Sequence, residues 1–121
     1  MSARANSFVL VCPEDWTPDN PDLTADPIRY DQFVLQLFKA DTAPNMLNHA
    51  ALGVASEAGE LVDAVKKHTI YGKPLDRANI IEELGDLRFY IQAMQNVLGI
   101  TEFEVLQANA NKLAKRYRGL K

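Results

Sequence analysis

The stretch HAALGVASEAGELVDAVKK, residues 49–67, decides the fold class. Its apolar residues return every three or four positions, which is the spacing of an amphipathic α-helix. A glycine in a helix interior lowers stability by about 1 kcal/mol relative to alanine. Within this helix, however, SEAGEL at 56–61 sets a glycine between two glutamates. Further along the chain, EELGDL at 82–87 repeats that order of acid, apolar residue, glycine, acid and leucine. The repetition of this costly pattern indicates that the two segments form a functional site.

Start and stop signals predict four helices and therefore an all-α, four-helix bundle-like fold. The predicted helices run over 26–40, from Pro44 to a stop at 71–74, over 76–99, and from Thr101 to the end of the chain. Asp26 followed by Pro27 is a typical helix start, and glycine at position 99 suits a helix end. Thr101 with Glu104 forms a capping box, which marks the start of the last helix.

Each of the last three helices carries an apolar stripe that we expect to face the bundle core. The stripes consist of Leu47, Ala51, Val54, Ala58, Leu61 and Val65; of Ile80, Leu84, Leu87, Ile91, Met94 and Leu98; and of Phe103, Leu106, Ala110, Leu113, Tyr117 and Leu120. Residues 1–26 differ, because prolines interrupt every helical pattern there. We predict an irregular N-terminal arm over 1–26, with one short strand in the apolar run 8–12, and an all-α domain over 27–121.

Composition limits the function classes. A chain of 121 residues suits one domain, and its net charge of −3 provides no general basic field for a nucleic-acid polymer. Cys12 is the single cysteine, which excludes an internal disulfide and a cysteine-based zinc site. No apolar run approaches the roughly 18 residues of a membrane span, and the N-terminal apolar run is too short for a signal peptide. We expect a cytoplasmic protein with no membrane partner.

The repeated segments present two pairs of carboxylates, Glu57 with Glu60 and Glu83 with Asp86. At a spacing of three, paired side chains are neighbours on one helix face, with Cβ atoms about 5–6 Å apart. An antiparallel hairpin of the two helices would bring both pairs into one site, where a divalent cation would relieve their repulsion. Oxygen ligands favour Mg²⁺ or Mn²⁺, which suit a phosphate substrate. The alternative is a solvated acidic face balanced by lysines.

A stripe of Asn109, Lys112 and Arg116 on the last helix, together with Lys67, lies on the flank that the acids occupy on their own helices. An amide and cations near a metal-loaded acidic site are what a triphosphate requires. The alternative for the basic residues is a favourable interaction with the helix dipole. His49 is a candidate for lining a base pocket, with a structural or exposed role as its alternative.

The glycines predict two further features. Gly53 lies one turn before Glu57 on the acid face, where its missing side chain would leave room for a ligand. Gly59 and Gly85 lie on the opposite flank, where they would allow a neighbouring helix or subunit to approach closely.

These motifs resemble those of the MazG-like all-α nucleoside triphosphate pyrophosphohydrolases of bacteria and phages. The resemblance rests on Glu57-x-x-Glu60, a gap of 22 residues and Glu83-x-x-Asp86, together with the words HAALGVASEAGELVDAVKK, EELGDLRFY and NANKLAKRY, and it covers about residues 45–118. It implies Mg²⁺-dependent hydrolysis of a nucleoside triphosphate to the monophosphate and pyrophosphate. We favour a standard or modified deoxynucleoside triphosphate as substrate.

The resemblance also implies roles for residues. It implies metal ligands at Glu57, Glu60, Glu83 and Asp86, and phosphate or sugar contacts at Lys67, Asn109, Lys112 and Arg116. Glu57 or Glu60 would orient the attacking water, and the resemblance further implies a homodimer or homotetramer. Two other classes stay open: a non-catalytic nucleotide-binding or regulatory module of the same fold, and a purely structural helical oligomer.

Overall fold

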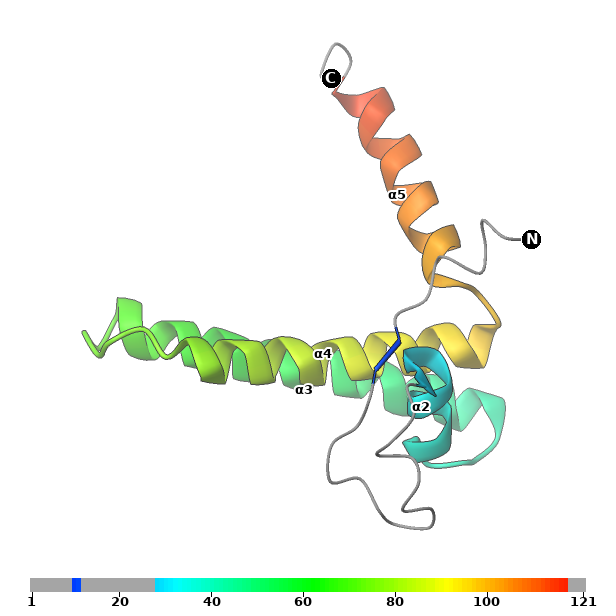
Figure 1. Cartoon of the computed structure of the whole chain (residues 1–121), viewed down its shortest axis with the longest axis horizontal. Coiled ribbons are helices and arrows are strands. Elements are labelled where there is room, and N and C mark those ends of the chain that lie inside the picture. Colours follow the sequence, from blue (N-terminus) through cyan, green and yellow to red (C-terminus); the bar gives the residue numbers. More distant parts are fainter. Residues whose placement is uncertain (1–9, 12–27, 118–121) are drawn as a thin grey trace. The chain divides into compact units, whose positions relative to one another are not determined.

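A computed structural model of the chain describes residues 10–11 and 28–117. The described elements are β1 (Leu10–Val11), β2 (Ile28–Arg29), α2 (Tyr30–Leu37), α3 (Ala43–Thr69), α4 (Arg77–Leu98) and α5 (Glu102–Arg116) (Figure 1). The predicted all-α fold class is confirmed. Residues 38–98 form one compact unit, and the remaining residues belong to the other. None of the described helices is both long and apolar enough to cross a membrane.

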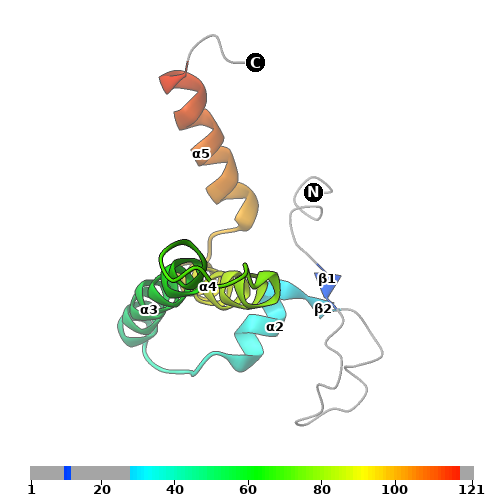
Figure 2. The same cartoon turned by 90° about the vertical axis from the view of Figure 1, so that its left-hand side faces the viewer.

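Helices α3 and α4 lie side by side as an antiparallel hairpin within the first of these units (Figures 1 and 2). Helix α3 begins after Thr42, whose hydroxyl accepts a hydrogen bond from the backbone N–H of Asn45 at 3.4 Å. The loop over 70–76 follows, with Gly72 at φ +69°. Asp76 then accepts a hydrogen bond from the backbone N–H of Asn79 at 3.1 Å, so the predicted cap of α4 is confirmed.

The two helices pack along a line of small residues. Ala50, Gly53 and Ala64 of α3 are buried, as is Ala93 of α4. This buried line of α3 runs one position before the predicted apolar stripe, of which Ala51 and Val65 are exposed. The predicted stripe of α3 is therefore confirmed only in part: Leu47, Val54, Ala58 and Leu61 are half-buried, whereas the most deeply buried residues lie one position earlier, where small side chains permit the closer approach of two helix backbones. Glu57, one turn after Gly53, consequently lies on the same face as the buried small residues and is half-buried.

An aromatic cluster packs at the end of the hairpin near the start of α3. The Phe38 ring stacks on His49, with centroids 4.6 Å apart, and is only 8% exposed. Tyr90 lies edge-on to Phe89 at 5.2 Å and to Phe38 at 6.3 Å. Edge-to-face pairs of this kind add about 0.5–1.5 kcal/mol to the stabilisation from burial. The cluster therefore fixes the aromatic side chains of α4 against α3 and the segment before it.

The other unit contains the short strands and α2. Leu10 pairs with Arg29 and Val11 with Ile28 in an antiparallel ladder, so the predicted strand within 8–12 is confirmed at these two residues. The prediction of a helix from Asp26 was wrong over Ile28–Arg29, because those residues are extended and paired with β1. Helix α2 also ends at Leu37, short of the predicted end at residue 40. The predicted cap at 26–27 and most of the predicted arm lie outside the described residues.

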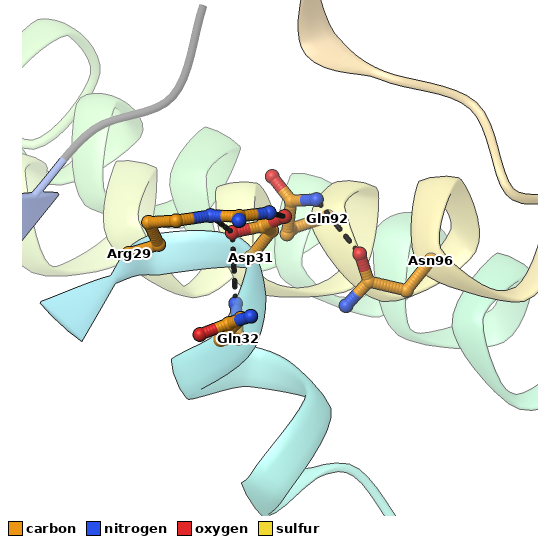
Figure 3. Close-up of polar contacts among 5 residues, drawn as sticks. All are labelled: Arg29, Asp31, Gln32, Gln92 and Asn96. Carbon is orange, nitrogen blue, oxygen red and sulfur yellow. Dashed lines mark hydrogen bonds and ion pairs between the residues drawn. The ribbon is translucent and has the colours of Figure 1, made fainter. Parts of the chain in front are cut away.

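Polar contacts mark the start of α2 and the second half of α4 (Figure 3). The guanidinium of Arg29 donates two hydrogen bonds to the Asp31 carboxylate, at 3.1 and 2.6 Å. In α4, the buried Gln92 donates from Nε2 to Oδ1 of Asn96 at 3.0 Å. Gln95 is also buried, and its Nε2 has no hydrogen-bond partner in the described part of the chain. A buried donor left unpaired in this way costs about 1–3 kcal/mol.

Helix α5 begins with the predicted capping box. The Thr101 hydroxyl accepts from the backbone N–H of Glu104 at 3.0 Å, and the Glu104 carboxylate accepts from the backbone N–H of Thr101 at 2.8 Å. Gly99, at φ +68°, separates α4 from this cap. No residue of α5 over 102–116 is buried, so packing of its apolar stripe stays a prediction.

Because no residue of α5 is buried, its stability depends strongly on local interactions such as the cap. Replacing an N-cap threonine by alanine typically costs about 1 kcal/mol. We expect Thr101→Ala to speed amide hydrogen exchange within α5 about fivefold, as measured by mass spectrometry, while exchange in α3 stays unchanged. Equal exchange in α5 of the two proteins would show that the cap does not support the helix.

Candidate functional site

The α3–α4 hairpin brings carboxylates from both helices together. Glu57 lies one turn after the buried Gly53, and Glu83 and Asp86 lie at a spacing of three on α4. One carboxylate oxygen from each of Glu57, Glu83 and Asp86 lies within 4.8 Å of the others. The convergence of the repeated segments across a hairpin is therefore seen at these residues. We call this group the carboxylate cluster.

The cluster is partly shielded from water. Glu57 and Glu83 are half-buried between the helices, whereas Asp86 is exposed. Glu60, the remaining predicted ligand, is exposed and lies outside the group. Its charge nevertheless acts on Glu83, so Glu60 stands close to the edge of the cluster.

Electrostatic repulsion is built into the cluster. Desolvation raises the pKa of Glu83 above its ordinary value, and the charges of Asp86, Glu60, Glu57 and Glu82 raise it further. No ion pair reaches the cluster from the residues that the structure describes. Lys67, the lysine predicted to lie on the acid flank of α3, pairs with Asp63 at 3.8 Å rather than with the cluster, so the alternative of an acidic face balanced by lysines gains no support from it.

The donor set fits a hard divalent cation. It consists of carboxylate oxygens, and no histidine or cysteine joins it in the described residues. Oxygen-only ligands suit Mg²⁺ or Mn²⁺, and Mg²⁺ keeps part of its coordination for water and phosphate oxygens. One face of the cluster is open at Asp86, where such ligands could enter.

The structure changes the interpretation of Gly53. The predicted room for a ligand at this position is absent, because the Tyr90 ring fills it. At Gly59 and Gly85, by contrast, an added Cβ would meet no atom within 4 Å, so no helix of this chain approaches them closely in the described residues. Approach by a second subunit stays a prediction.

The remaining residues predicted to contact the substrate lie outside the carboxylate cluster. His49 stacks on Phe38 and lies 5.9 Å from the Tyr90 ring, so it belongs to the aromatic cluster beyond Gly53. Asn109, Lys112 and Arg116 are exposed along α5, which belongs to the other unit. Their approach to the carboxylates, like the roles of His49 and Lys67, stays a prediction.

Sequence reasoning missed Tyr90. The signal was available, since Tyr90 follows Asp86 by one turn, just as Gly53 precedes Glu57 by one turn. In an antiparallel hairpin that pairs Glu57 with Asp86, these two residues must also face each other. A bulky residue opposite a glycine is a packing signal rather than a ligand signal.

Comparison with known proteins gives two matches. Residues 47–120 match the family model described as the MazG nucleotide pyrophosphohydrolase domain. The chain is also similar to the Gene 37 protein of Mycobacterium phage L5, with 32% identity over an alignment of 74 positions that covers 58% of this chain and 65% of that protein. The matched part is thus less than two thirds of the phage protein. No solved structure gives a significant match.

The raised pKa of Glu83 makes a prediction for the metal-free protein. The unfolded chain has the ordinary value of 4.5, so the stability linked to the protonated carboxyl is complete below that pH and is lost as pH rises through the higher folded-state pKa. Glu83→Gln removes the loss of stability at higher pH, because glutamine carries no ionisable carboxyl group. With a chelator present, we expect the variant to have a thermal unfolding midpoint near that of wild type at about pH 4 and above it at pH 7. A lower midpoint than wild type at pH 7 would contradict the repulsion.

Proposed function

The chain belongs to the MazG nucleotide pyrophosphohydrolase domain family, and from this premise we propose that it is a Mg²⁺-dependent nucleoside triphosphate pyrophosphohydrolase. The proposed reaction adds water across the bond between the α and β phosphates and releases a nucleoside monophosphate and pyrophosphate. We favour a deoxynucleoside triphosphate, standard or modified, as the substrate. The observation that carries the proposal is the carboxylate cluster, which lies inside the matched residues.

Glu57, Glu83 and Asp86 would hold Mg²⁺, or Mn²⁺ in its place, with Glu60 as a fourth carboxylate at the edge. The bound cation would offset the charge on the phosphates and the leaving pyrophosphate. Half-burial of Glu57 and Glu83 keeps competing water away from part of the site and strengthens their interaction with a cation.

The attacking water requires a proton acceptor. Glu57 and Glu60 are the two candidates, and Glu60 has the stronger case because it lies outside the carboxylate cluster. Its carboxylate would accept a hydrogen bond from the water and orient it toward the α phosphate. Lys67, Asn109, Lys112 and Arg116 would bind phosphate or sugar oxygens, and His49 would lie beside the base.

A nucleotide panel tests the reaction. Wild type is expected to release pyrophosphate from at least one standard or oxidised nucleoside triphosphate in the presence of Mg²⁺. Glu57→Gln removes a cluster carboxylate and should lower kcat/KM at least about 100-fold, or about 2.7 kcal/mol of transition-state stabilisation. Glu82→Gln makes the same charge change on α4 outside the cluster and should stay within about threefold of wild type.

The outcomes separate the function classes. No turnover of any nucleotide with Mg²⁺ or Mn²⁺ would overturn the enzyme. Tight nucleotide binding in calorimetry without pyrophosphate release would instead support a non-catalytic binding module. Unchanged metal affinity in Glu57→Gln would support a structural role for the acids.

We also propose a homodimer or homotetramer that covers the apolar side chains left outside the hairpin. Val62 is 63% exposed on α3 and Ile81 is 64% exposed on α4. Gly59, one turn before Val62, leaves space that a second helix pair could occupy. Close approach at glycine is a common way to pack helices tightly.

A charge introduced at Val62 tests this assembly. Val62→Glu is expected to shift sedimentation of the protein toward the monomer, because burying the new carboxylate at a subunit contact is costly. Asn48→Glu places the same charge at an exposed polar position of α3 and should leave assembly unchanged. Wild type that sediments as a monomer at micromolar concentration would contradict the proposal.

A further inference from the structure

The Tyr90 ring of α4 lies directly against the backbone of α3 at Gly53. A Cβ atom added at Gly53 would overlap the Cγ, Cδ1 and Cε1 atoms of that ring. Contacting carbons normally stay about 3.5–4.0 Å apart, so no side chain larger than hydrogen fits without movement. Gly53 is also buried, so the ring occupies the space that a side chain would need.

Other aromatic rings pack around the Tyr90 ring, which is itself half-buried. Phe89 meets it edge-on at 5.2 Å, Phe38 lies 6.3 Å away and His49 lies 5.9 Å away. Phe38 is itself buried. An added methyl group at Gly53 would therefore press on a ring that packs against its neighbours, so the ring, its neighbours or the two helices would have to shift.

The other glycines inside the hairpin helices provide a contrast. An added Cβ at Gly59 or at Gly85 would meet no atom within 4 Å. All three positions carry the cost of glycine in a helix, about 1 kcal/mol relative to alanine. Within the described chain, only Gly53 offsets that cost with a close contact.

The contact stands one helical turn from the carboxylate cluster on both helices. Gly53 precedes Glu57 by four residues on α3, and Tyr90 follows Asp86 by four residues on α4. Because the helices are antiparallel, the two pairs form adjacent layers about 6 Å apart along the hairpin. Since each helix is stiff over a single turn, a change in helix separation at the first layer also changes the separation at the second.

We infer that Gly53 and Tyr90 are positioning residues that set the spacing of the carboxylate cluster for its cation. The inference rests on the metal site of the proposed function. Mg²⁺ requires nearly octahedral ligands at 2.0–2.1 Å, and a workable site holds its ligands within about 0.2 Å of such values. A displacement of the helices by a methyl group exceeds that tolerance, whereas it leaves both helices able to form.

Mn²⁺ affinity, measured by electron paramagnetic resonance of the free ion, tests the inference without relying on activity. Gly53→Ala is expected to weaken Mn²⁺ binding at least tenfold, with helical circular dichroism unchanged. Gly59→Ala adds the same methyl to the same helix in open space and should stay within about twofold of wild type. Tyr90→Phe keeps the contacting ring carbons and removes only the hydroxyl, so it should also bind Mn²⁺ like wild type.

A compensating pair sharpens the test. Tyr90→Leu replaces the ring that separates the two helices with a smaller side chain and is expected to weaken Mn²⁺ binding severalfold by itself. Combined with Gly53→Ala, it makes room for the added methyl, so the double variant should bind Mn²⁺ more tightly than Gly53→Ala does. A merely destabilising role for each residue predicts instead that the two losses add.

The outcomes are distinct. Wild type that binds Mn²⁺ while Gly53→Ala binds it equally well would overturn this inference and leave the proposed function standing. Wild type that binds no Mn²⁺ would overturn the proposed metal site and this inference with it. Should Gly53→Ala not reach the helical content of wild type, Tyr90→Leu decides the matter, because unchanged Mn²⁺ affinity in that variant would overturn the spacing role.

Discussion

The packing of the Tyr90 ring on the Gly53 backbone is the contact on which the arrangement of the hairpin depends. It holds α3 and α4 close together although the next layer sets carboxylates against one another. The apolar contact, which favours a closed hairpin, and the electrostatic repulsion, which opposes it, therefore lie in neighbouring layers. The aromatic cluster stabilises the closed hairpin, and in that hairpin desolvation, together with the charges of the neighbouring acids, raises the pKa of Glu83. A cation would remove the repulsion while leaving the packing unchanged.

The parts of the fold that could be predicted from the sequence are the helix ends that local signals determine. The capping box of Thr101 and Glu104, the cap at Asp76 and the glycine at position 99 act within a few residues, and the helices begin and end where these signals stand. The first helix was predicted to start too early, because Ile28–Arg29 is held extended by β1 from a distant part of the sequence. Pairing between distant segments leaves no local mark.

In the candidate site, too, features set by spacing along one helix could be predicted, whereas features that depend on another helix could not. The spacing of three within each acid pair predicted that an antiparallel hairpin would bring all four carboxylates together, and Glu57, Glu83 and Asp86 do meet, whereas Glu60 lies outside the group. The role of Gly53 was predicted wrongly, because the residue that fills its space lies on another helix. The most deeply buried residues of α3 lie one position before the predicted stripe for a related reason: apolarity identifies which side chains avoid water, whereas small size determines where two backbones can meet.

The short connection over 70–76 has a consequence for how the chain acquires its structure. Closing a small loop loses little entropy, so contacts between α3 and α4 form readily once both are present. Helix α3 alone is a weak helix, since it contains Gly53 and Gly59 in its interior. It therefore gains most of its order when α4 packs against it. In a chain leaving the ribosome, the carboxylates would converge only once α4 has emerged and packed against α3, so metal affinity would arise in a single step with the hairpin.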